Sequence, residues 1–397
     1  SVGMERLVPA CDNVVADGME VFTNSPMARE ARRANLRLIL SEHDTSCTSC
    51  SRSGNCTLQS LANDFNMRGE HYPTKLRREA VDYSTPLIRE NDKCVKCMRC
   101  IQICENVQTV KIWDLLGTGS RATVDASRNR RIQDTECTYC GQCITHCPTA
   151  ALRERDDTGI VFDAIDDPNT VTVVQVAPAV RAAWGEELGL TDEDAPVGKI
   201  FDALKRMGVD YAFDTVFSAD LTIMEESTEF ISRFTSGELK DRPMFTSCCP
   251  GWVRFAKSQF PYMVNYLSTA KSPQQMFGAV MKTYFAEKLG VSPDQIFTLS
   301  IMPCVAKKGE REMDLFYGEY AGHDVDAVLT TRELVKMIRS AHIRPNTLVE
   351  IPGDSPMHAG TGAGVIFGAT GGVMEAALRT AVETLTGETL SGDALNF

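Results

Sequence analysis

The cysteines carry the most specific chemical signal in this sequence. Fifteen of its 397 residues are cysteine, and twelve of them precede residue 150. They recur with two-residue gaps, which scattered core thiols would not do, and thiolates are the soft ligands that iron and zinc bind. No secretory signal is visible in the first 30 residues, so an odd number of cysteines indicates metal binding or redox chemistry rather than disulfides.

Two groups share the spacing Cys-x2-Cys-x2-Cys-x3-Cys, and Pro148 follows the second group. In two-cluster bacterial ferredoxins with this spacing, the fourth cysteine of each run binds the other cluster. The spacing predicts two [4Fe-4S] clusters, one held by Cys94, Cys97, Cys100 and Cys147 and the other by Cys137, Cys140, Cys143 and Cys104. Structural zinc is the weaker alternative, because a zinc site has no use for eight cysteines in duplicated order.

A third group combines one histidine with three cysteines as His-x3-Cys-x2-Cys-x5-Cys. Its members are His43, Cys47, Cys50 and Cys56. The spacing alone also suits a zinc ion. We favour a [4Fe-4S] cluster, because a helix predicted from Pro26, with Ser25 as its N-cap, leads directly into this group. Cys11 stands alone, and a lone cysteine is more typical of a buried core position than of a ligand.

Composition limits the class of protein. The net charge is −12 and the pI is about 5.1, so the chain lacks the basic excess that nucleic-acid binding requires. No uninterrupted apolar run is long enough to span a membrane. We therefore expect a cytoplasmic, multidomain protein with neither nucleic acid nor membrane as its partner.

From about residue 165 the pattern changes to short apolar runs that alternate with amphipathic segments. The runs are 171–180, 211–217, 244–248, 296–304 and 325–331. This alternation predicts parallel strands covered by helices. Cys248 and Cys304 then end predicted strands, where open α/β sheets place their sites. Buried structural cysteines are the alternative; neighbouring thiols at Cys248 and Cys249 would point in different directions and serve different roles.

Taken together, these motifs resemble those of [FeFe] hydrogenases. Cys11, the histidine-containing group and the two-cluster repeat occur in that order at the front of the family, and the large iron-sulfur subunit of complex I shares the first part. The segments FTSCCPGWVRFAKSQFP, SIMPCVAKKGE and TGAGVIFGATGGVMEAALR distinguish the hydrogenase. The chain is most similar to the catalytic subunit of the multimeric, NAD(P)-linked type, truncated at both ends, since it begins with Ser1.

The resemblance implies an H-cluster, which is a [4Fe-4S] cubane joined to a diiron subcluster. Cys249 and Cys304 match two ligands of the cubane, and the other two belong to a C-terminal Cys-x3-Cys segment. No cysteine follows Cys304. We therefore expect either that the polypeptide continues beyond Phe397 or that this fragment cannot hold an active cluster. Cys11 matches the last of four ligands to a [2Fe-2S] cluster, whose other ligands would precede Ser1.

The resemblance also assigns roles around the H-cluster. Cys248 is the first proton relay, Lys307 donates to a cyanide ligand, and the relay continues through Glu226, Ser268, Glu229 and Arg233, while Met302, Ala177 and Pro178 line the pocket. On a helix, Glu226 and Glu229 share one face, although such an acidic stripe alone is more typical of a solvated surface. The glycines of 360–372 lack a dinucleotide-binding pattern, and close approach of backbone to a cofactor explains them better.

We expect an α+β and α/β multidomain chain with four parts. They are the end of a [2Fe-2S] domain (1–24), a histidine-ligated [4Fe-4S] domain (25–78), a two-[4Fe-4S] ferredoxin domain (79–160) and an α/β H-cluster domain with parallel sheets flanked by helices (161–397).

The expected reaction is reversible H2 oxidation and proton reduction. The expected partners are an NAD(P)H-binding flavin and iron-sulfur subunit and a small [2Fe-2S] subunit, with ferredoxin as a further candidate and bifurcation between the acceptors left open. One alternative is a hydrogenase-like electron-transfer or sensory protein without a functional H-cluster. A complex I-type subunit would explain only the front third of the sequence.

Overall fold

The structure is a computed structural model that describes residues 7–67, 72–73, 80–318, 322–356 and 360–390. The chain forms two compact units, which are described separately. The first comprises Ser1–Tyr83, Ile88–Arg131 and Gln142–Arg153, and the second comprises Ser84–Leu87, Ile132–Gly141 and Glu154–Phe397. The four domain ranges expected from the sequence stay predictions, and their ends at residues 1, 78, 79 and 397 lie outside the described residues.

The first unit consists of short elements separated by the cysteine loops. Its helices are α1 (Pro26–Ser41), α2 (Thr57–Asp64), α3 (Arg99–Gln102) and α4 (Gln142–Thr145). β2 (Trp113–Leu116) and β3 (Thr123–Ala126) form an antiparallel pair, and β1 (Leu87–Arg89) pairs with β4 (Leu152–Glu154). The helix predicted after Ser25 is confirmed, and the Ser25 side chain accepts a hydrogen bond from the amide of Ala28 as its N-cap.

The second unit is built on a parallel sheet of four strands in the order β10-β7-β5-β6. The strands are β5 (Val171–Val176), β6 (Tyr211–Asp214), β7 (Ile296–Met302) and β10 (Ala327–Thr330). Their registers place the carboxyl ends of all four strands at one edge. The predicted parallel sheet is confirmed at four of its five expected strands.

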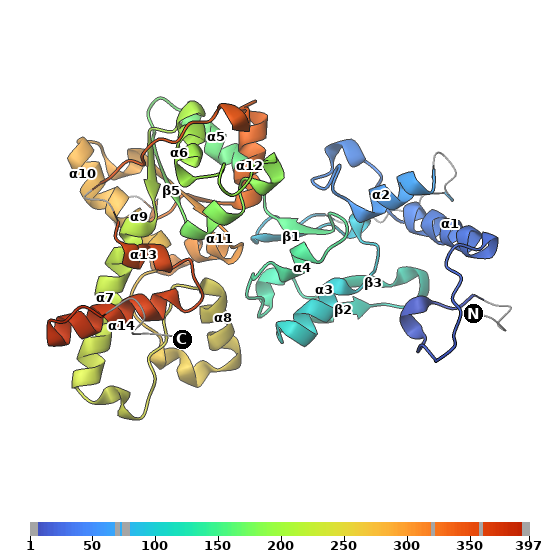
Figure 1. The fold of residues 1–397 in the computed structure, drawn as a ribbon, viewed down its shortest axis with the longest axis horizontal. Coiled ribbons are helices and arrows are strands. Elements are labelled where there is room, and N and C mark those ends of the chain that lie inside the picture. Colours follow the sequence, from blue (N-terminus) through green and yellow to red (C-terminus); the bar gives the residue numbers. More distant parts are fainter. Residues whose placement is uncertain (1–6, 68–71, 74–79, 319–321, 357–359, 391–397) are drawn as a thin grey trace. The chain divides into compact units, whose positions relative to one another are not determined.

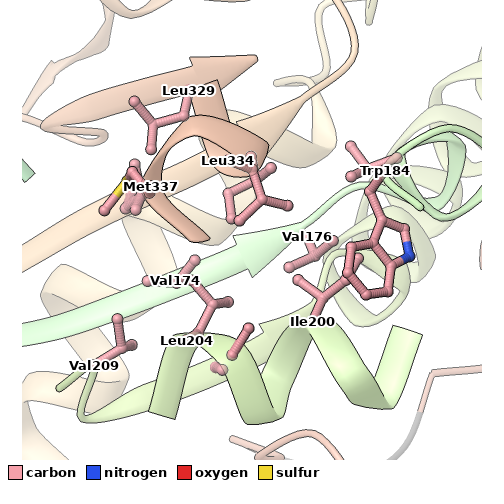
Figure 2. Packing of buried hydrophobic residues seen from close by; sticks show 14 of the residues in the cluster. Val174, Val176, Trp184, Ile200, Leu204, Val209, Leu329, Leu334 and Met337 are labelled. Atoms are coloured by element: carbon pink, nitrogen blue, oxygen red, sulfur yellow. The ribbon is translucent and has the colours of Figure 1, made fainter. Parts of the chain in front are cut away.

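Successive side chains of a strand point to opposite faces of the sheet, and here both sets are buried. Helices therefore cover both faces. Val174 and Val176 of β5 pack with α6 (Val197–Arg206) and α12 (Thr331–Ser340), as Figure 2 shows, whereas Val173 faces a cluster of phenylalanines. These phenylalanines lie on β6, α7 (Val216–Thr235), α9 (Pro273–Val280) and the π-helical turn Met281–Phe285.

The other α-helices of the second unit are α5 (Thr158–Asp166), α8 (Pro250–Gln259), α10 (Ala286–Leu289), α11 (Ala306–Arg311), α13 (Gly362–Ile366) and α14 (Gly372–Thr386) (Figure 1). Two short strands, β8 (Tyr317–Gly318) and β9 (Gly322–His323), pair antiparallel. Among the described residues, no helix combines the length and the apolar composition needed to cross a membrane.

One predicted strand is wrong. The run 244–248 is not a strand of the sheet; Phe245 makes only an isolated parallel bridge with Leu267. The run is short, contains Thr246 and Ser247, and is enclosed by prolines at 243 and 250, so it cannot supply a full ladder of hydrogen bonds. Cys248 therefore lies just before the N-cap of a helix rather than at the end of a sheet strand.

Candidate functional site

The carboxyl edge of the parallel sheet gathers the residues expected to line a pocket. Ala177 follows β5 and its amide donates to the carbonyl of Ile301, 3.0 Å away in β7. Pro178 begins the next turn, and Gly368 approaches it so closely that an added Cβ would lie 3.3 Å from the Pro178 Cβ. Ala177 and Met302 are buried. Three of the expected lining residues thus meet at one edge.

Cys304 and Cys249 approach this edge from two helix starts. Cys304 follows β7 and precedes α11, while Cys249 is the N-cap of α8 and its Sγ accepts a hydrogen bond from the Trp252 amide at 3.4 Å. Burial raises the pKa of the Cys304 thiol; the Ala306 amide lowers it, and the neighbouring Cys249 thiol raises it further. The two thiols are therefore close enough to interact electrostatically, as two ligands of one group must be.

Lys307 is held in place by an acid that the sequence did not single out. Its Nζ lies 2.9 and 3.1 Å from the two carboxylate oxygens of Glu310 and donates to the carbonyl of Cys248 at 2.8 Å. Glu310 is buried and also accepts hydrogen bonds from Ser272 and Gln274, each at 3.0 Å. The ammonium is thus fully partnered beside the thiols.

Cys248 lies between this ion pair and the expected proton relay. Burial raises the pKa of its thiol to about 11, which Lys307 opposes and the carboxylate of Glu226 reinforces. A half-buried thiol with this pKa stays protonated at neutral pH. Cys248 can therefore hold a proton at the junction of two charged groups.

The relay residues lie together along α7 and the segment after Leu267, as the sequence predicted for the two glutamates. The Ser268 hydroxyl donates to Glu229 at 3.0 Å, and Arg233 pairs with the other oxygen of Glu229 at 2.5 Å. Glu226 is 2% exposed, and neither of its oxygens has a hydrogen-bond partner. Burial raises its pKa, and the nearby Ser268 hydroxyl and Ser247 amide lower it. The solvated-surface alternative is therefore wrong for Glu226.

The glycines of 360–372 serve helix packing. A Cβ on Gly360 would lie 2.3 Å from Val216 Cγ1, and one on Gly364 would lie 2.5 Å from the Val216 carbonyl. A Cβ on Gly372 would lie 1.7 Å from the carbonyl of Ile366. These glycines therefore permit close contact of α13 with α7 and of α14 with α13. The close approach of their backbone to a cofactor, which the sequence led us to expect, does not explain them.

A segment of the second cysteine repeat packs within the second unit. Arg254 of α8 donates to the carbonyl of Cys137 at 2.8 Å, and its guanidinium lies 4.6 Å from the ring centroid of Tyr139. A Cβ on Gly251 would lie 3.4 Å from the Thr138 carbonyl and 3.8 Å from Cys249 Sγ. The loop that carries Cys137 thus contacts the helix that begins at Cys249.

In the first unit, the histidine group lies in one loop between α1 and α2. His43 is 8% exposed and its buried Nδ1 has no hydrogen-bond partner. Burial lowers the pKa of His43, which favours the neutral imidazole that binds metals. Burial also raises the pKa of Cys47, and Cys50 and Cys56 raise it further. The four expected ligands thus offer one unpartnered nitrogen and three neighbouring thiols.

The first unit also contains a pocket lined by the crossed ligand set. Cys94, Cys97, Cys100 and Cys147 all line it, together with Arg89, around about 310 Å³ of space that includes its open mouth. Cys94 Sγ accepts a hydrogen bond from the Lys96 amide at 3.4 Å. In the described part of the chain, no three His, Cys, Asp or Glu side chains are arranged to hold a single metal ion.

The other crossed set is divided between the units. Cys104 and Cys143 belong to the first unit, and Cys137 and Cys140 belong to the second. Within each unit the thiols accept amide hydrogen bonds, from Ile112 to Cys104 at 3.3 Å and from Tyr139 to Cys137 at 3.5 Å. This ligand set stays a prediction.

None of the 15 cysteines forms a disulfide. Cys11 is exposed in the turn Ala10–Asp12, so the interpretation of Cys11 as a buried core residue is wrong. Its assignment as a [2Fe-2S] ligand stays a prediction.

Sequence reasoning missed the polar residues that hold the site. Glu310 stands three residues after Lys307, and this helical spacing of opposite charges was the available signal. Gln274 has no such signal, since its role depends on α9 packing against α11. The same is true of Arg254, whose partners lie more than 110 residues away.

The donor chemistry of these sites fits iron-sulfur groups. Four thiols that line one pocket, beside a cation without a hydrogen-bond partner, suit a cluster in the first unit, and Cys249 with Cys304 supplies two soft ligands at the sheet edge.

Comparison with known proteins agrees with this arrangement. Three protein families match the chain: "Iron only hydrogenase large subunit, C-terminal domain" over residues 170–396, "NADH-ubiquinone oxidoreductase-G iron-sulfur binding region" over 32–71 and "4Fe-4S dicluster domain" over 93–151. The chain therefore has iron-sulfur binding regions followed by a hydrogenase domain, and its cofactors are iron-sulfur groups.

Individual relatives cover most of the chain. The NADP-reducing hydrogenase subunit HndD of Solidesulfovibrio fructosivorans is 46% identical over 98% of this chain and 67% of its own length. Iron hydrogenase 1 of Clostridium pasteurianum is 41% identical over 94% of this chain and 65% of its own length. The chain thus spans about two thirds of the length of these curated relatives.

A solved structure of an apo [FeFe]-hydrogenase variant from Chlamydomonas reinhardtii matches 59% of this chain and 60% of its own, with 44% identity and a TM-score of 0.54. Fold, motifs and relatives agree, and the chain belongs to the iron-only hydrogenase large-subunit family.

Proposed function

We propose that this protein catalyses the reversible oxidation of H2 to protons and electrons at an H-cluster that has Cys249 and Cys304 among its ligands. The observation that carries the proposal is the junction at the sheet edge. There, Cys248 lies beside the two candidate ligands and is influenced by both Lys307 and Glu226. When bound, the H-cluster supplies the metal chemistry that forms or breaks the H–H bond.

Lys307 and Glu310 prepare the pocket for an anionic group. A buried cation stabilises negative charge in a region of low dielectric, and Glu310 fixes the position of the ammonium through both of its oxygens. Met302, Ala177 and Pro178 enclose the same edge with apolar surface, which keeps bulk water away. These residues would orient the group rather than exchange protons with it.

Protons would move through the residues next to Cys248. Its thiol is neutral at pH 7 and can give up and regain a proton, and the raised pKa of Glu226 makes this buried carboxyl a suitable next carrier. The Ser268 hydroxyl, already bonded to Glu229, would connect the two glutamates. Arg233 would hold Glu229 at the outer end of this path.

Electrons would leave the H-cluster toward the cluster of Cys137, Cys140, Cys143 and Cys104. The packing of Arg254 on the Cys137 loop supports this step, because the helix that begins at Cys249 contacts that loop directly. The cluster at Cys94, the histidine-ligated cluster and a [2Fe-2S] cluster with Cys11 as one ligand would follow. An NAD(P)-reducing flavin subunit and a small [2Fe-2S] subunit would accept the electrons, with ferredoxin as a further acceptor.

The test uses the complete natural polypeptide after anaerobic H-cluster maturation. We expect infrared bands of metal-bound CO and cyanide, together with H2-dependent reduction of a viologen dye. Cys304→Ala should lose the infrared bands yet retain the iron of the first unit, which makes it the matched control for iron content. Absence of CO and cyanide bands from the matured parent protein would overturn the proposal and favour the electron-transfer or sensory alternative.

The partner assignment is tested separately. Purified complex should reduce NADP or NAD with H2, whereas the chain alone should reduce only the dye. Reduction of a pyridine nucleotide by the isolated chain would show that no flavin partner is needed.

A further inference from the structure

Arg89 is a buried cation whose hydrogen-bonding capacity is unused. It ends β1, five positions before Cys94, and its side chain is 5% exposed. None of its three guanidinium nitrogens has a hydrogen-bond partner. The nearest carboxylate oxygen, on Asp125, lies 3.6 Å from Nε, which is too long for a hydrogen bond. Buried N–H groups are rarely left unsatisfied, so these N–H groups point to a ligand.

The guanidinium of Arg89, which makes no hydrogen bond, lines the same pocket as the four thiols of the proposed Cys94 cluster. Cys100 and Arg89 both line this pocket, so the positive charge of the guanidinium lies beside the thiols. The guanidinium is also supported by Trp113, whose ring centroid lies 5.6 Å from its central carbon. Arg89 is therefore fixed next to the thiols and acts on them through its charge.

We infer that Arg89 sets the reduction potential of the [4Fe-4S] cluster in this pocket by holding a positive charge and N–H donors against it. The inference rests on the proposed ligand set Cys94, Cys97, Cys100 and Cys147. Reduction adds one electron and makes the cluster more negative. A nearby cation and hydrogen bonds to cluster sulfur stabilise that reduced state, and they act strongly because the site is buried. Arg89 thus raises the potential.

The second repeat lacks this device at the matching position. Five residues before Cys137 the chain has Ile132, which is buried and apolar. Two clusters with the same cysteine spacing would therefore differ in potential, with the cluster at Cys94 the better electron acceptor. Electrons arriving from the H-cluster side would collect at Cys94, which favours electron flow away from the catalytic unit.

The test is a redox titration of the holoenzyme followed by EPR, which measures potential independently of activity. Arg89→Met should move one [4Fe-4S] signal to lower potential. The expected shift is at least a tenfold change in the ratio of reduced to oxidised cluster, or about 59 mV for one electron. Arg99→Met removes an equal charge from an exposed position at the start of α3 and is the matched control. Its smaller effect should disappear at high salt, because exposed charges are screened.

Two further substitutions separate charge from hydrogen bonding. Arg89→Lys should retain most of the potential, and Arg89→Gln, which keeps N–H donors without charge, should lie between the parent and Arg89→Met. If the Arg89→Met protein does not assemble its cluster, the reduction potential measured for Arg89→Gln tests the inference instead. An unchanged potential in these variants overturns the inference.

Cys97→Ala distinguishes this failure from failure of the ligand assignment. If Cys97→Ala leaves every cluster signal intact, the proposed ligand set is wrong and the inference about Arg89 falls with it. If it removes one signal, and the Arg89 variants leave the potential of that same signal unmoved, the ligand set stands and only the tuning role is overturned.

Discussion

In the first unit, four thiols and the guanidinium of Arg89 surround one pocket, and the N–H groups of that guanidinium have no partner. In the second unit, two thiols stand near Lys307, whose ammonium is bound by Glu310 and by the carbonyl of Cys248. Thiols and a cation occur in both places. Only the second adds a thiol that is not a candidate ligand, Cys248, and a chain of acids, which suits proton movement, whereas the first is suited to storing an electron.

The largest expected effect concerns proton transfer, which distinguishes the site of the second unit from the electron-storing site of the first. Substitution of Cys248 should disrupt it most strongly. Cys248→Ala should lower H2 oxidation by about 10²–10⁴-fold, the usual contribution of a positioned acid or base. The iron-sulfur EPR signals of the first unit should persist, because Cys248 belongs to the other unit. Dye-linked H2 oxidation measures the loss, and Ser232→Ala, at an exposed position of α7, is the control. An activity within twofold of the parent would remove Cys248 from the relay.

The second unit also depends on a buried ion cluster that has no counterpart at the Arg89 pocket. Lys308 is fully buried and donates to Asp157 and Glu333, each at 2.8 Å. Lys308→Met would leave the buried Glu333 without its cation and Asp157 paired with Arg155 alone, and it should lower the free energy of unfolding by about 3–5 kcal/mol. Thermal unfolding of the second unit measures this change.

The matched control is Lys336→Met, which breaks an exposed pair with Asp156 and should cost less than about 1 kcal/mol. Equal losses in the two variants would show that the buried cluster contributes no more than a surface pair.

How far the sequence reaches differs between the two regions. In the first unit, cysteine spacing predicted the set Cys94, Cys97, Cys100 and Cys147, and these four residues line one pocket. Arg89 was not predicted, because an arginine at the end of a short strand has no periodicity that reveals burial. Local spacing therefore identifies ligands, whereas the charge beside them depends on tertiary packing.

In the second unit, apolar runs predicted the parallel strands and helical spacing placed Glu226 with Glu229 on one helix. The strand expected at 244–248 was wrong, because a five-residue run does not show whether a neighbouring strand exists. Glu310 and Gln274 reach Lys307 from helix packing that no local pattern encodes. The sequence thus predicts elements and motif residues better than it predicts the residues that hold them in place.

A smaller effect is expected where the Cys137 loop meets α8. Arg254→Met removes a hydrogen bond and a cation–π contact, together worth about 1–2 kcal/mol. Local opening of residues 137–141 should become roughly five- to thirtyfold more frequent. Amide hydrogen exchange of that loop measures it, with Lys257→Met, an exposed position on the same helix, as the control. Unchanged exchange would mean that the loop is held by other contacts.

The smallest effect, a pH trend, sharpens the comparison at Glu226. Burial raises its pKa above the ordinary value of 4.5, so the folded protein favours the neutral carboxyl. Below pH 4.5 the folded and unfolded states are both protonated. As the pH rises through the folded pKa, the folded state must bury a charge and loses that stability. Glu226→Gln cannot ionise, so the melting temperature of this variant should rise relative to that of the parent between pH 4.5 and the folded pKa. At higher pH the difference between the two melting temperatures should stay constant.

The matched control is Glu225→Gln, at an exposed neighbour on α7, whose melting temperature should follow the parent across the same pH range. Because Glu226 belongs to the second unit, cluster signals of the first unit should not follow this pH trend. A difference between Glu226→Gln and the parent that does not vary with pH would show that folding leaves the pKa of Glu226 at its ordinary value, so that this carboxyl is ionised at neutral pH. Glu226 would then hold a proton taken from Cys248 only at low pH, and at neutral pH the relay would need a different second carrier.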